Sequence, residues 1–186
     1  MGCGHRCGGI DGETNHLGCL VCSKEAKEFC TICGSDQLGS APTLRLGCQH
    51  LFHLHCVLKH IGGRWHSAAI SFGFMHCVIC KTLMSHPRLT STLQPYIAMH
   101  EDVRKKALQR FESMKLGDAP ELKEKGGFYY NNPEKYAMAR FCYYECAQCK
   151  KPYFGGLKEC NAEQRIAEFD PKELLCGGCS SNGNDT

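Results

Sequence analysis

The chain has 186 residues, a formal net charge of +3 and 42% hydrophobic residues, with sixteen cysteines and ten histidines. This apolar content excludes a wholly disordered chain, and no apolar run reaches the length of a membrane span. A charge this mild gives no argument of its own for nucleic-acid binding. Twenty glycines and seven prolines predict small, loop-rich modules, so we expect a small zinc-stabilised α+β fold.

The first residues lack the features of a secretory signal, because no hydrophobic segment follows Met1 to Arg6. We therefore expect an intracellular protein, cytoplasmic or nuclear, with no membrane partner. In that reducing environment thiols stay free to bind zinc. Five Cys-x2-Cys pairs run through the chain, and this gap lets two thiolates face one ion at about 2.3 Å: Cys19/Cys22, Cys30/Cys33, Cys77/Cys80, Cys146/Cys149 and Cys176/Cys179.

Residues 1–29 are interpreted as an N-terminal Cys/His segment with a possible extra zinc site. Its four thiols would be the ligands, with His5 or His16 as substitutes for one of them. The four cysteines are Cys3, Cys7, Cys19 and Cys22.

Residues 30–86 have the ligand spacing of a RING finger, with Cys, His, His and Cys in the middle of the series. Eight soft or borderline ligands in four pairs predict two closed tetrahedral zinc sites. In the cross-brace of that fold the sites interleave. One ion would be held by Cys30, Cys33, His53 and Cys56, and the other by Cys48, His50, Cys77 and Cys80. The remaining histidines of this region are expected to be ordinary surface or core residues.

A RING is a docking surface for a ubiquitin-conjugating enzyme. Ile32 and Trp65 stand at its usual apolar contact positions, although plain core packing would also explain them. Val78 stands where RINGs often have proline. Lys81 stands where many have the arginine that holds ubiquitin for direct transfer to lysine. Lysine lacks the planar fork of arginine and is a poor substitute.

Residues 87–127 are expected to be a helical linker. From Pro95 to about Met114 apolar residues recur every three or four positions, which predicts a helix with a packing face. Acidic residues precede basic ones by about one turn along it. Gly117 is the expected stop.

Residues 128–186 are interpreted as a partial tandem-cysteine domain, zinc-ribbon-like, with a polar tail that we expect to be disordered. Asn132-Pro133 predicts the cap and first turn of a short helix through Arg140. Asp170-Pro171 predicts a similar start. A four-thiolate zinc site is expected from Cys146, Cys149, Cys176 and Cys179, and a redox role for the last pair is disfavoured because no βαβ pattern surrounds it.

Two cysteines of this region remain. Cys142 lies in an aromatic run, so we expect a buried small hydrophobe. Cys160 lies in a polar stretch after Gly155-Gly156, which we interpret as the hinge of a mobile, exposed loop. From the residues alone, Cys160 is equally well an extra zinc ligand, an idle thiol or a nucleophile.

From Cys3 to Cys179 the chain resembles the C-terminal region of the Pam/Highwire ubiquitin ligases, which are of the RING-Cys-relay type. The Arg64-Trp65 pair, Lys81 and the distance from the RING to Cys160 agree with that family. The matching segments are residues 48–56 (CQHLFHLHC), 70–81 (ISFGFMHCVICK), 101–110 (EDVRKKALQR), 136–163 (YAMARFCYYECAQCKKPYFGGLKECNAE) and 170–179 (DPKELLCGGC).

The resemblance implies a mechanism and partners. The RING would recruit a charged ubiquitin-conjugating enzyme, and Cys160, which matches the first relay cysteine, would accept ubiquitin as a thioester. In the family a second cysteine downstream takes ubiquitin next and passes it to a hydroxyl. This sequence ends at Thr186 without that cysteine, so we expect a truncated relay acting on an unknown protein substrate.

Two alternatives stay open. In the first, the protein is a RING ligase or adaptor that promotes direct transfer from the conjugating enzyme while Cys160 is idle. In the second, it is a zinc-ribbon nucleic-acid binder or scaffold. The second is disfavoured because the basic residues are scattered and do not alternate with aromatics.

Overall fold

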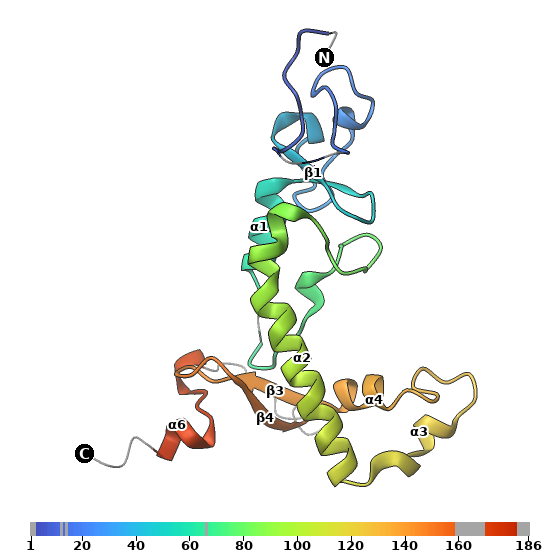
Figure 1. The fold of residues 1–186 in the computed structure, drawn as a ribbon, viewed down its shortest axis with the longest axis vertical. Coiled ribbons are helices and arrows are strands. Elements are labelled where there is room, and N and C mark those ends of the chain that lie inside the picture. Colours follow the sequence, from blue (N-terminus) through green and yellow to red (C-terminus); the bar gives the residue numbers. More distant parts are fainter. Residues whose placement is uncertain (1–2, 12, 14, 66, 159–169, 182–186) are drawn as a thin grey trace. The chain divides into compact units, whose positions relative to one another are not determined.

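The structure is a computed structural model that describes residues 3–11, 13, 15–65, 67–158 and 170–181 (Figure 1). The chain divides into two compact units. The first consists of Met1–Arg64 and Ser71–Tyr96, and the second of Trp65–Ile70 and Ile97–Thr186. Among the described residues no helix is both long enough and apolar enough to cross a membrane.

The first unit contains a short hairpin followed directly by a helix, and it also includes the start of the longer helix Thr90–Ser113. Strands β1 (Thr43–Arg45) and β2 (Leu51–His53) are antiparallel, with Leu44 opposite Phe52. Helix α1 (Leu54–Gly62) begins where β2 ends. Single 3-10 turns occupy much of the rest: η1 (Glu25–Lys27), η2 (Leu38–Ser40), η3 (Gly73–Met75) and η4 (Pro87–Leu89).

The core of the first unit is small. Each fully buried Leu, Val or Phe contributes roughly 1.5–3 kcal/mol, which leaves much of the stability to other interactions. Leu17, from the N-terminal segment, is among the buried side chains. The largest fully buried apolar side chains of this unit are Leu17, Leu44, Leu46, Phe52, Val57, Ile61 and Leu89.

Helix α2 (Thr90–Ser113) is the longest element and begins five residues before the expected start at Pro95. The η4 turn leads directly into it, because His86 Nδ1 accepts the N–H of Arg88 and caps that turn. Pro95 therefore lies inside the helix, near its beginning, where its missing N–H removes one hydrogen bond.

The predicted packing face of α2 is confirmed in its second half, where Val103, Ala107 and Phe111 are buried in the second unit. The predicted stop at Gly117 is wrong. The helix ends at Ser113, and Lys115 then adopts a left-handed conformation with φ of 52°. Lys115, and not Gly117, is therefore the left-handed residue that follows the end of the helix.

The second unit continues with short helices and a second hairpin. The predicted helix after Asn132 is confirmed as α4 (Pro133–Arg140), whose cap is the Asn132 side chain accepting the N–H of Lys135. Asp170 starts only a 3-10 turn. The other elements are η5 (Leu116–Asp118), α3 (Pro120–Lys123), β3 (Phe141–Glu145), β4 (Pro152–Leu157), η6 (Pro171–Glu173) and α6 (Gly177–Ser181).

Strands β3 and β4 pair antiparallel, with a bulge between Cys142 and Tyr143 (Figure 1). A third segment joins β3, because the N–H of Ile70 donates to the carbonyl of Tyr143 over 2.8 Å. Arg110 of α2 lies over the Phe154 ring at 3.5 Å from its centre. Aromatic side chains thus supply much of the packing in this unit.

The interpretation of Gly155-Gly156 as the hinge of a mobile loop is wrong. Both glycines belong to β4, where Gly156 pairs with Cys142 beside the bulge. A Cβ atom on Gly155 would lie 2.7 Å from the Tyr144 ring, so glycine is required there for close packing of the two strands.

Candidate metal centres

The described residues contain four groups of Cys and His whose ligand atoms all lie within 4.8 Å of one another. The first group is Cys30, Cys33, His53 and Cys56. The second group is Cys48, His50, Cys77 and Cys80. The C-terminal group is Cys146, Cys149, Cys176 and Cys179, and the N-terminal group is Cys3, His5, Cys19 and Cys22.

The first and second groups alternate along the chain. Of the four ligand pairs between residues 30 and 80, the first group takes pairs one and three, and the second takes pairs two and four. The structure thus brings together the same eight residues, in the same two sets, that the spacing grouped. Because each set joins segments far apart in sequence, a metal in either site would close a long loop.

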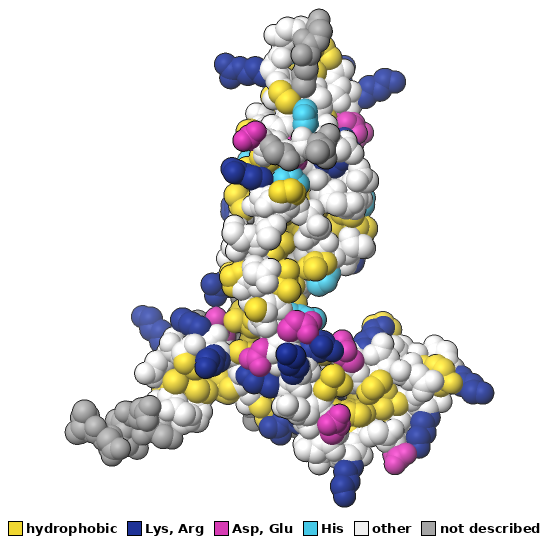
Figure 2. All heavy atoms as spheres, viewed as in Figure 1, with side chains coloured by type: hydrophobic (Ala, Val, Ile, Leu, Met, Phe, Trp, Pro, Cys, Tyr) yellow, Lys and Arg dark blue, Asp and Glu magenta, His cyan; other side chains and the backbone are white. Residues whose placement is uncertain are grey.

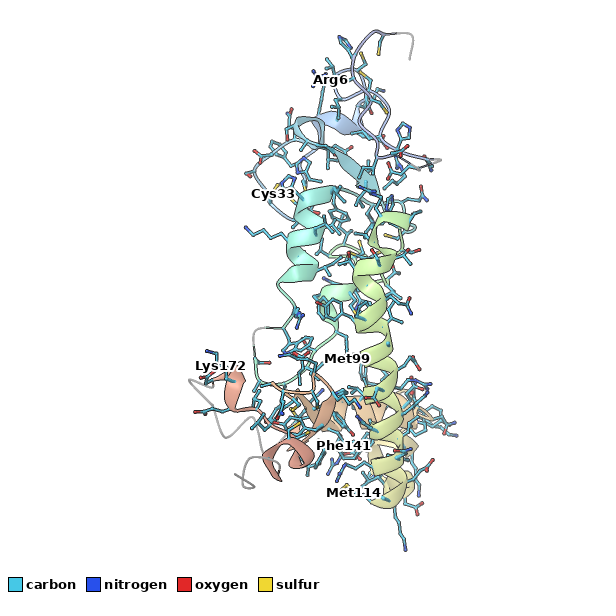
Figure 3. All side chains as sticks on the ribbon, turned by 60° about the vertical axis from the view of Figure 1, so that its left-hand side comes forward. Arg6, Cys33, Met99, Met114, Phe141 and Lys172 are labelled. Atoms are coloured by element: carbon cyan, nitrogen blue, oxygen red, sulfur yellow. The ribbon has the colours of Figure 1, made fainter. Side chains whose placement is uncertain are left out.

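The hairpin and α1 place the ligands of the first group. His53 ends β2 and is the N-cap of α1, while Cys56 lies in the first turn of that helix. Cys33 lies beside the start of α1 (Figure 3), and its Sγ is 3.8 Å from His53 Nδ1. Cys56 Sγ is 3.7 Å from the same nitrogen. Three donors therefore surround one point at the end of β2.

The imidazole of His53 is oriented as a ligand. Its Nε2 lies 3.0 Å from the carbonyl of Gln37, and a carbonyl can only accept, so Nε2 carries the proton. The lone pair is then on Nδ1, which faces the two thiols. Histidine ligands of zinc are commonly fixed through the second ring nitrogen in this way. His50 also presents Nδ1, at 3.4 Å from Cys48 Sγ.

The Cys-x2-Cys turns of the four groups share a backbone pattern. In each, the residue four positions after the first cysteine donates its N–H to that cysteine's carbonyl. Lys81 and Lys150 do so with positive φ values of 61° and 59°. The hydrogen bonds are Ser23 to Cys19 (3.1 Å), Gly34 to Cys30 (2.8 Å), Lys81 to Cys77 (2.9 Å) and Lys150 to Cys146 (2.9 Å).

In each group the pKa shifts favour the thiolate, the form that binds metal, at one sulfur and oppose it at another. Within a group the thiols differ, because one is stabilised as an anion while another is crowded or buried. Burial raises the pKa of Cys56 to about 12. Hydrogen bonds lower the pKa to about 6 for Cys33, chiefly from the N–H of Asp36, for Cys80, chiefly from the Thr82 hydroxyl, and for Cys146, chiefly from the N–H of Cys149.

The donor sets fit zinc. The first and second groups each offer three sulfurs and one imidazole nitrogen, and the C-terminal group offers four sulfurs. Soft sulfur and borderline nitrogen donors in fours match the tetrahedral preference of Zn²⁺. Four protein ligands leave no position for water, so such sites are structural.

The C-terminal group ties the end of the described chain to the β3–β4 hairpin. The N–H of Cys176 donates to Cys146 Sγ over 3.4 Å, and the N–H of Ala147 donates to the carbonyl of Leu174 over 2.7 Å. Cys146 follows β3 directly and is fully buried. The two pairs therefore form one site on the hairpin.

The N-terminal group differs from the expected set of four thiols. His5 is in the group, with Nδ1 3.2 Å from Cys22 Sγ, whereas Cys7 lies outside it. Cys7 Sγ is instead 3.7 Å from Nδ1 of His16. His5 is one of the two histidines that the sequence offers as a substitute for a thiol, and Cys3-x-His5 repeats the spacing of the Cys-x-His pair in the second group.

Two further cysteines were singled out. Cys142 is 2% exposed in β3, which confirms it as a buried small hydrophobe. Cys160 lies outside the described residues. The last described residue before it, Lys158, is exposed and donates to the carbonyl of Met138 over 2.9 Å.

The residues expected to contact a partner lie on or near the Cys-x2-Cys turns, with one exception. Ile32 and Val78 are half-buried within the turns of the first and second groups, and Ile79 beside Val78 is 47% exposed. Lys81 is exposed, and its Nζ donates to the carbonyl of Val78 over 2.8 Å. Trp65 is half-buried and belongs to the second unit.

The additional histidines of residues 30–86 belong to none of the four groups as far as the structure describes them. His55 comes nearest, with Nε2 3.3 Å from Cys56 Sγ. His76 lies 3.0 Å from the carbonyl of Phe72, and His86 contacts Glu13. His60 is half-buried, and its pKa is lowered by burial and by Lys81. His66 lies outside the described residues.

Comparison with known proteins places these groups in context. No family model matches the chain. It is 42% identical over 187 residues to the E3 ubiquitin-protein ligase MYCBP2 of Danio rerio and 39% identical over 197 residues to the E3 ubiquitin-protein ligase highwire of Drosophila melanogaster. Each match covers 96% of this chain but only 4% of the relative, so the chain corresponds to a small segment of those proteins.

Proposed function

Over 96% of its length the chain is homologous to a segment of the E3 ubiquitin ligases of the Pam/Highwire family, and we propose that it is itself a ubiquitin ligase. The observation that carries the proposal is the alternation of the first and second groups within residues 30–80 of a chain with such relatives. The pair of sites acts as the frame of a RING, and its partners are ubiquitin, a ubiquitin-conjugating enzyme and a protein substrate.

The docking surface for the conjugating enzyme includes the two Cys-x2-Cys turns of this frame. Ile32 and Val78 present apolar side chains there, and Ile79 adds an exposed one. Apolar groups on a rigid turn suit a protein contact, because little conformational entropy is lost on binding. Zinc holds these turns and takes no part in the chemistry. The fourth residue expected from the sequence, Trp65, belongs to the second unit, so the proposed surface rests on the turns of the first unit alone.

Lys81 supports covalent transfer through this protein over direct transfer to lysine. Its ammonium group donates to the carbonyl of Val78, within its own turn. An arginine at this position would offer a planar fork of donors to two partners at once, which a single ammonium group cannot do. The RING thus brings the charged enzyme close without strongly activating it for attack by lysine.

Cys160 is the proposed acceptor of ubiquitin. Its thiolate attacks the carbonyl carbon of the thioester between ubiquitin and the conjugating enzyme. A new thioester forms on Cys160, and the thiolate of the conjugating enzyme leaves, so no oxidant or reductant is needed. Support comes from the match of Cys160 to the first relay cysteine. The four groups also use thirteen of the sixteen thiols, and each is complete without Cys160, so this thiol is not needed as a ligand in any of them.

A single-turnover discharge assay tests this proposal. Ubiquitin-charged conjugating enzyme is mixed with the full chain and analysed on a non-reducing gel. We expect a thiol-sensitive ubiquitin adduct with the native chain and a thiol-resistant oxyester with Cys160→Ser. Cys7→Ser is the matched control, because Cys7 is an exposed cysteine outside the four groups, and it should retain the adduct.

The outcomes separate two mechanisms. Absence of an adduct with every conjugating enzyme would overturn the Cys160 step. If lysine discharge persisted and required Ile32, the protein would be a docking RING with an idle Cys160. A nucleic-acid role is not proposed, because on the face drawn in Figure 2 the Lys and Arg side chains are scattered among acidic ones and form no stripe.

A further inference from the structure

The N-terminal group lies outside the RING series, and its donors repeat those of the second group. Both combine a Cys-x-His pair with a Cys-x2-Cys pair: Cys3 and His5 with Cys19 and Cys22 in one, Cys48 and His50 with Cys77 and Cys80 in the other. In both, the histidine presents Nδ1 to sulfur. Three sulfurs and one nitrogen in this arrangement form a complete tetrahedral donor set for a divalent ion.

The turn at Cys19 has the backbone form of a metal-binding turn. Its Sγ accepts the N–H groups of Val21 and Cys22 over 3.3 and 3.2 Å. The N–H of Ser23 donates to the Cys19 carbonyl, as in the turns of the other three groups. Hydrogen bonds directed at sulfur from two amides hold the thiolate in place for an ion.

The segment between His5 and Cys19 is a loop closed at its base. The N–H of Gly8 donates to the carbonyl of Gly18 over 2.8 Å, and Cys7 and Cys19 form a β-bridge. The loop docks on β1, because the carbonyl of Gly8 accepts the N–H of Thr43 over 3.2 Å. An ion bound by the N-terminal group would therefore fix both ends of a loop that already contacts residues 30–86.

Glu13, within this loop, makes further contacts through a side chain that is almost fully buried. One carboxylate oxygen accepts the N–H of Ile10 over 2.6 Å, inside the loop. The other lies 3.3 Å from the N–H of Arg45 in β1 and 2.6 Å from Nε2 of His86. The side chains of Glu13 and His86 are 4% and 3% exposed. One carboxylate thus joins the loop, β1 and the segment that leads into α2.

We propose that Cys3, His5, Cys19 and Cys22 bind a zinc ion, and that this ion holds the loop so that Glu13 ties the N-terminal segment to β1 and to His86. The site is structural, with all four positions filled by the protein. It adds a third metal to the first unit, beyond the two of the proposed RING, and it does not depend on ubiquitin transfer.

Elemental analysis of the purified full chain tests the site. With four groups each holding one ion, we expect four zinc ions per chain. Cys22→Ser and His5→Ala should each reduce this to three. Cys7→Ser is the matched control and should leave four, because Cys7 lies outside the group. Four zinc ions in Cys22→Ser and in His5→Ala would overturn the proposal.

A second variant covers the case in which a ligand substitution unfolds the chain and releases more than one ion. His5→Cys preserves four donors, so it should keep four metal ions. In the cobalt-substituted protein it should shift the visible d–d absorption towards that of four thiolates. An unchanged cobalt spectrum would exclude His5 as a ligand. Neither measurement involves ubiquitin, so failure here is distinct from failure of the proposed function.

The role of the loop has its own readout in amide hydrogen exchange. Loss of the metal in His5→Ala should raise exchange at Thr43, Arg45 and Arg88, the amides that the loop contacts or that His86 caps. Cys7→Ser should leave these rates unchanged. Unchanged protection in a His5→Ala chain that has lost one zinc would overturn the proposed role of the ion.

Discussion

His86 uses both of its ring nitrogens, and Glu13 takes one of them. Nδ1 accepts the N–H of Arg88 over 3.1 Å, so the ring proton is on Nε2, which donates to Glu13 over 2.6 Å. The imidazole is thus neutral, and its single N–H donates a hydrogen bond to a buried carboxylate. The same ring that caps η4 is therefore held in one orientation by a residue far away in sequence.

Glu13→Gln should destabilise the first unit without releasing zinc. The amide keeps the shape but loses the charge-assisted bonds to His86, Ile10 and Arg45, at a cost of about 1–3 kcal/mol. Urea denaturation of the full chain measures this. Glu28→Gln, at an exposed position, is the control and should change stability by less than about 0.5 kcal/mol. Equal effects of the two substitutions would contradict a special role for Glu13.

Gly155→Ala should destabilise the second unit by about 1–3 kcal/mol, because its Cβ would meet the Tyr144 ring at 2.7 Å. Gly117→Ala is the matched control, since a Cβ there meets no atom within 4 Å. Thermal unfolding followed by near-ultraviolet circular dichroism, which reports on the packed tyrosines, separates the two. A Gly155→Ala variant as stable as Gly117→Ala would disprove this close packing.

Zinc retention should depend on pH in a defined direction. In the metal-free chain the thiols of Cys33, Cys80 and Cys146 have lowered pKa values of about 6, against an ordinary 9.0, whereas burial raises the pKa of Cys56 to about 12. Lowered values mean stabilisation that is full above pH 9 and lost as pH falls through 6. We expect zinc release, followed with a chromophoric chelator, to rise steeply near and below pH 6, with loss of the circular dichroism signal. Excess chelator at pH 8 should also unfold both units. A spectrum that survives chelation would contradict structural metal.

Lys81→Arg should increase direct discharge of ubiquitin to free lysine several-fold. The guanidinium offers donors to two partners, while the lysine ammonium donates to Val78. The measurement is loss of the charged conjugating enzyme in the presence of lysine, with Cys160→Ala as the background so that residue 160 cannot accept ubiquitin. Lys123→Arg, at an exposed site in the second unit, is the control. No gain with Lys81→Arg would show that the residue type at this position does not limit direct transfer.

Local signals predicted local structure well. The cap of α4 is formed by Asn132 accepting from Lys135, as the Asn-Pro sequence indicated. The buried face of α2 follows from the spacing of Val103, Ala107 and Phe111. Both depend on residues within one or two turns of each other, where propensity and periodicity decide the outcome.

The errors came from long-range contacts. The start of α2 depends on His86, whose orientation is set by Glu13, so Pro95 was a misleading boundary. The sequence suggests a hinge at Gly155, because the reason for a glycine at this position is its close packing against the Tyr144 ring. That packing is visible only in the structure. In each case the deciding partner lies far enough away in sequence that no local pattern contains it.

Metal-ligand spacing was informative where ligands pair closely along the chain, and misleading at the N-terminus. There Cys7 and His5 both stand within reach of the pair Cys19/Cys22, so spacing alone did not choose between them. The structure chooses His5 and places Cys7 against His16. The backbone pairing of Cys7 with Cys19 accompanies this choice.

The left-handed residues that end two of the Cys-x2-Cys turns have a consequence for protein engineering. Lys81 and Lys150 occupy a conformation in which a side chain costs roughly 1 kcal/mol more than glycine, and Gly34 fills the equivalent place in the first group. Glycine would therefore be the residue of lower strain at two positions where the chain carries a cation. Any screen that selects this protein for heat resistance alone should tend to replace these lysines with glycine, and their electrostatic contribution would be lost in the process.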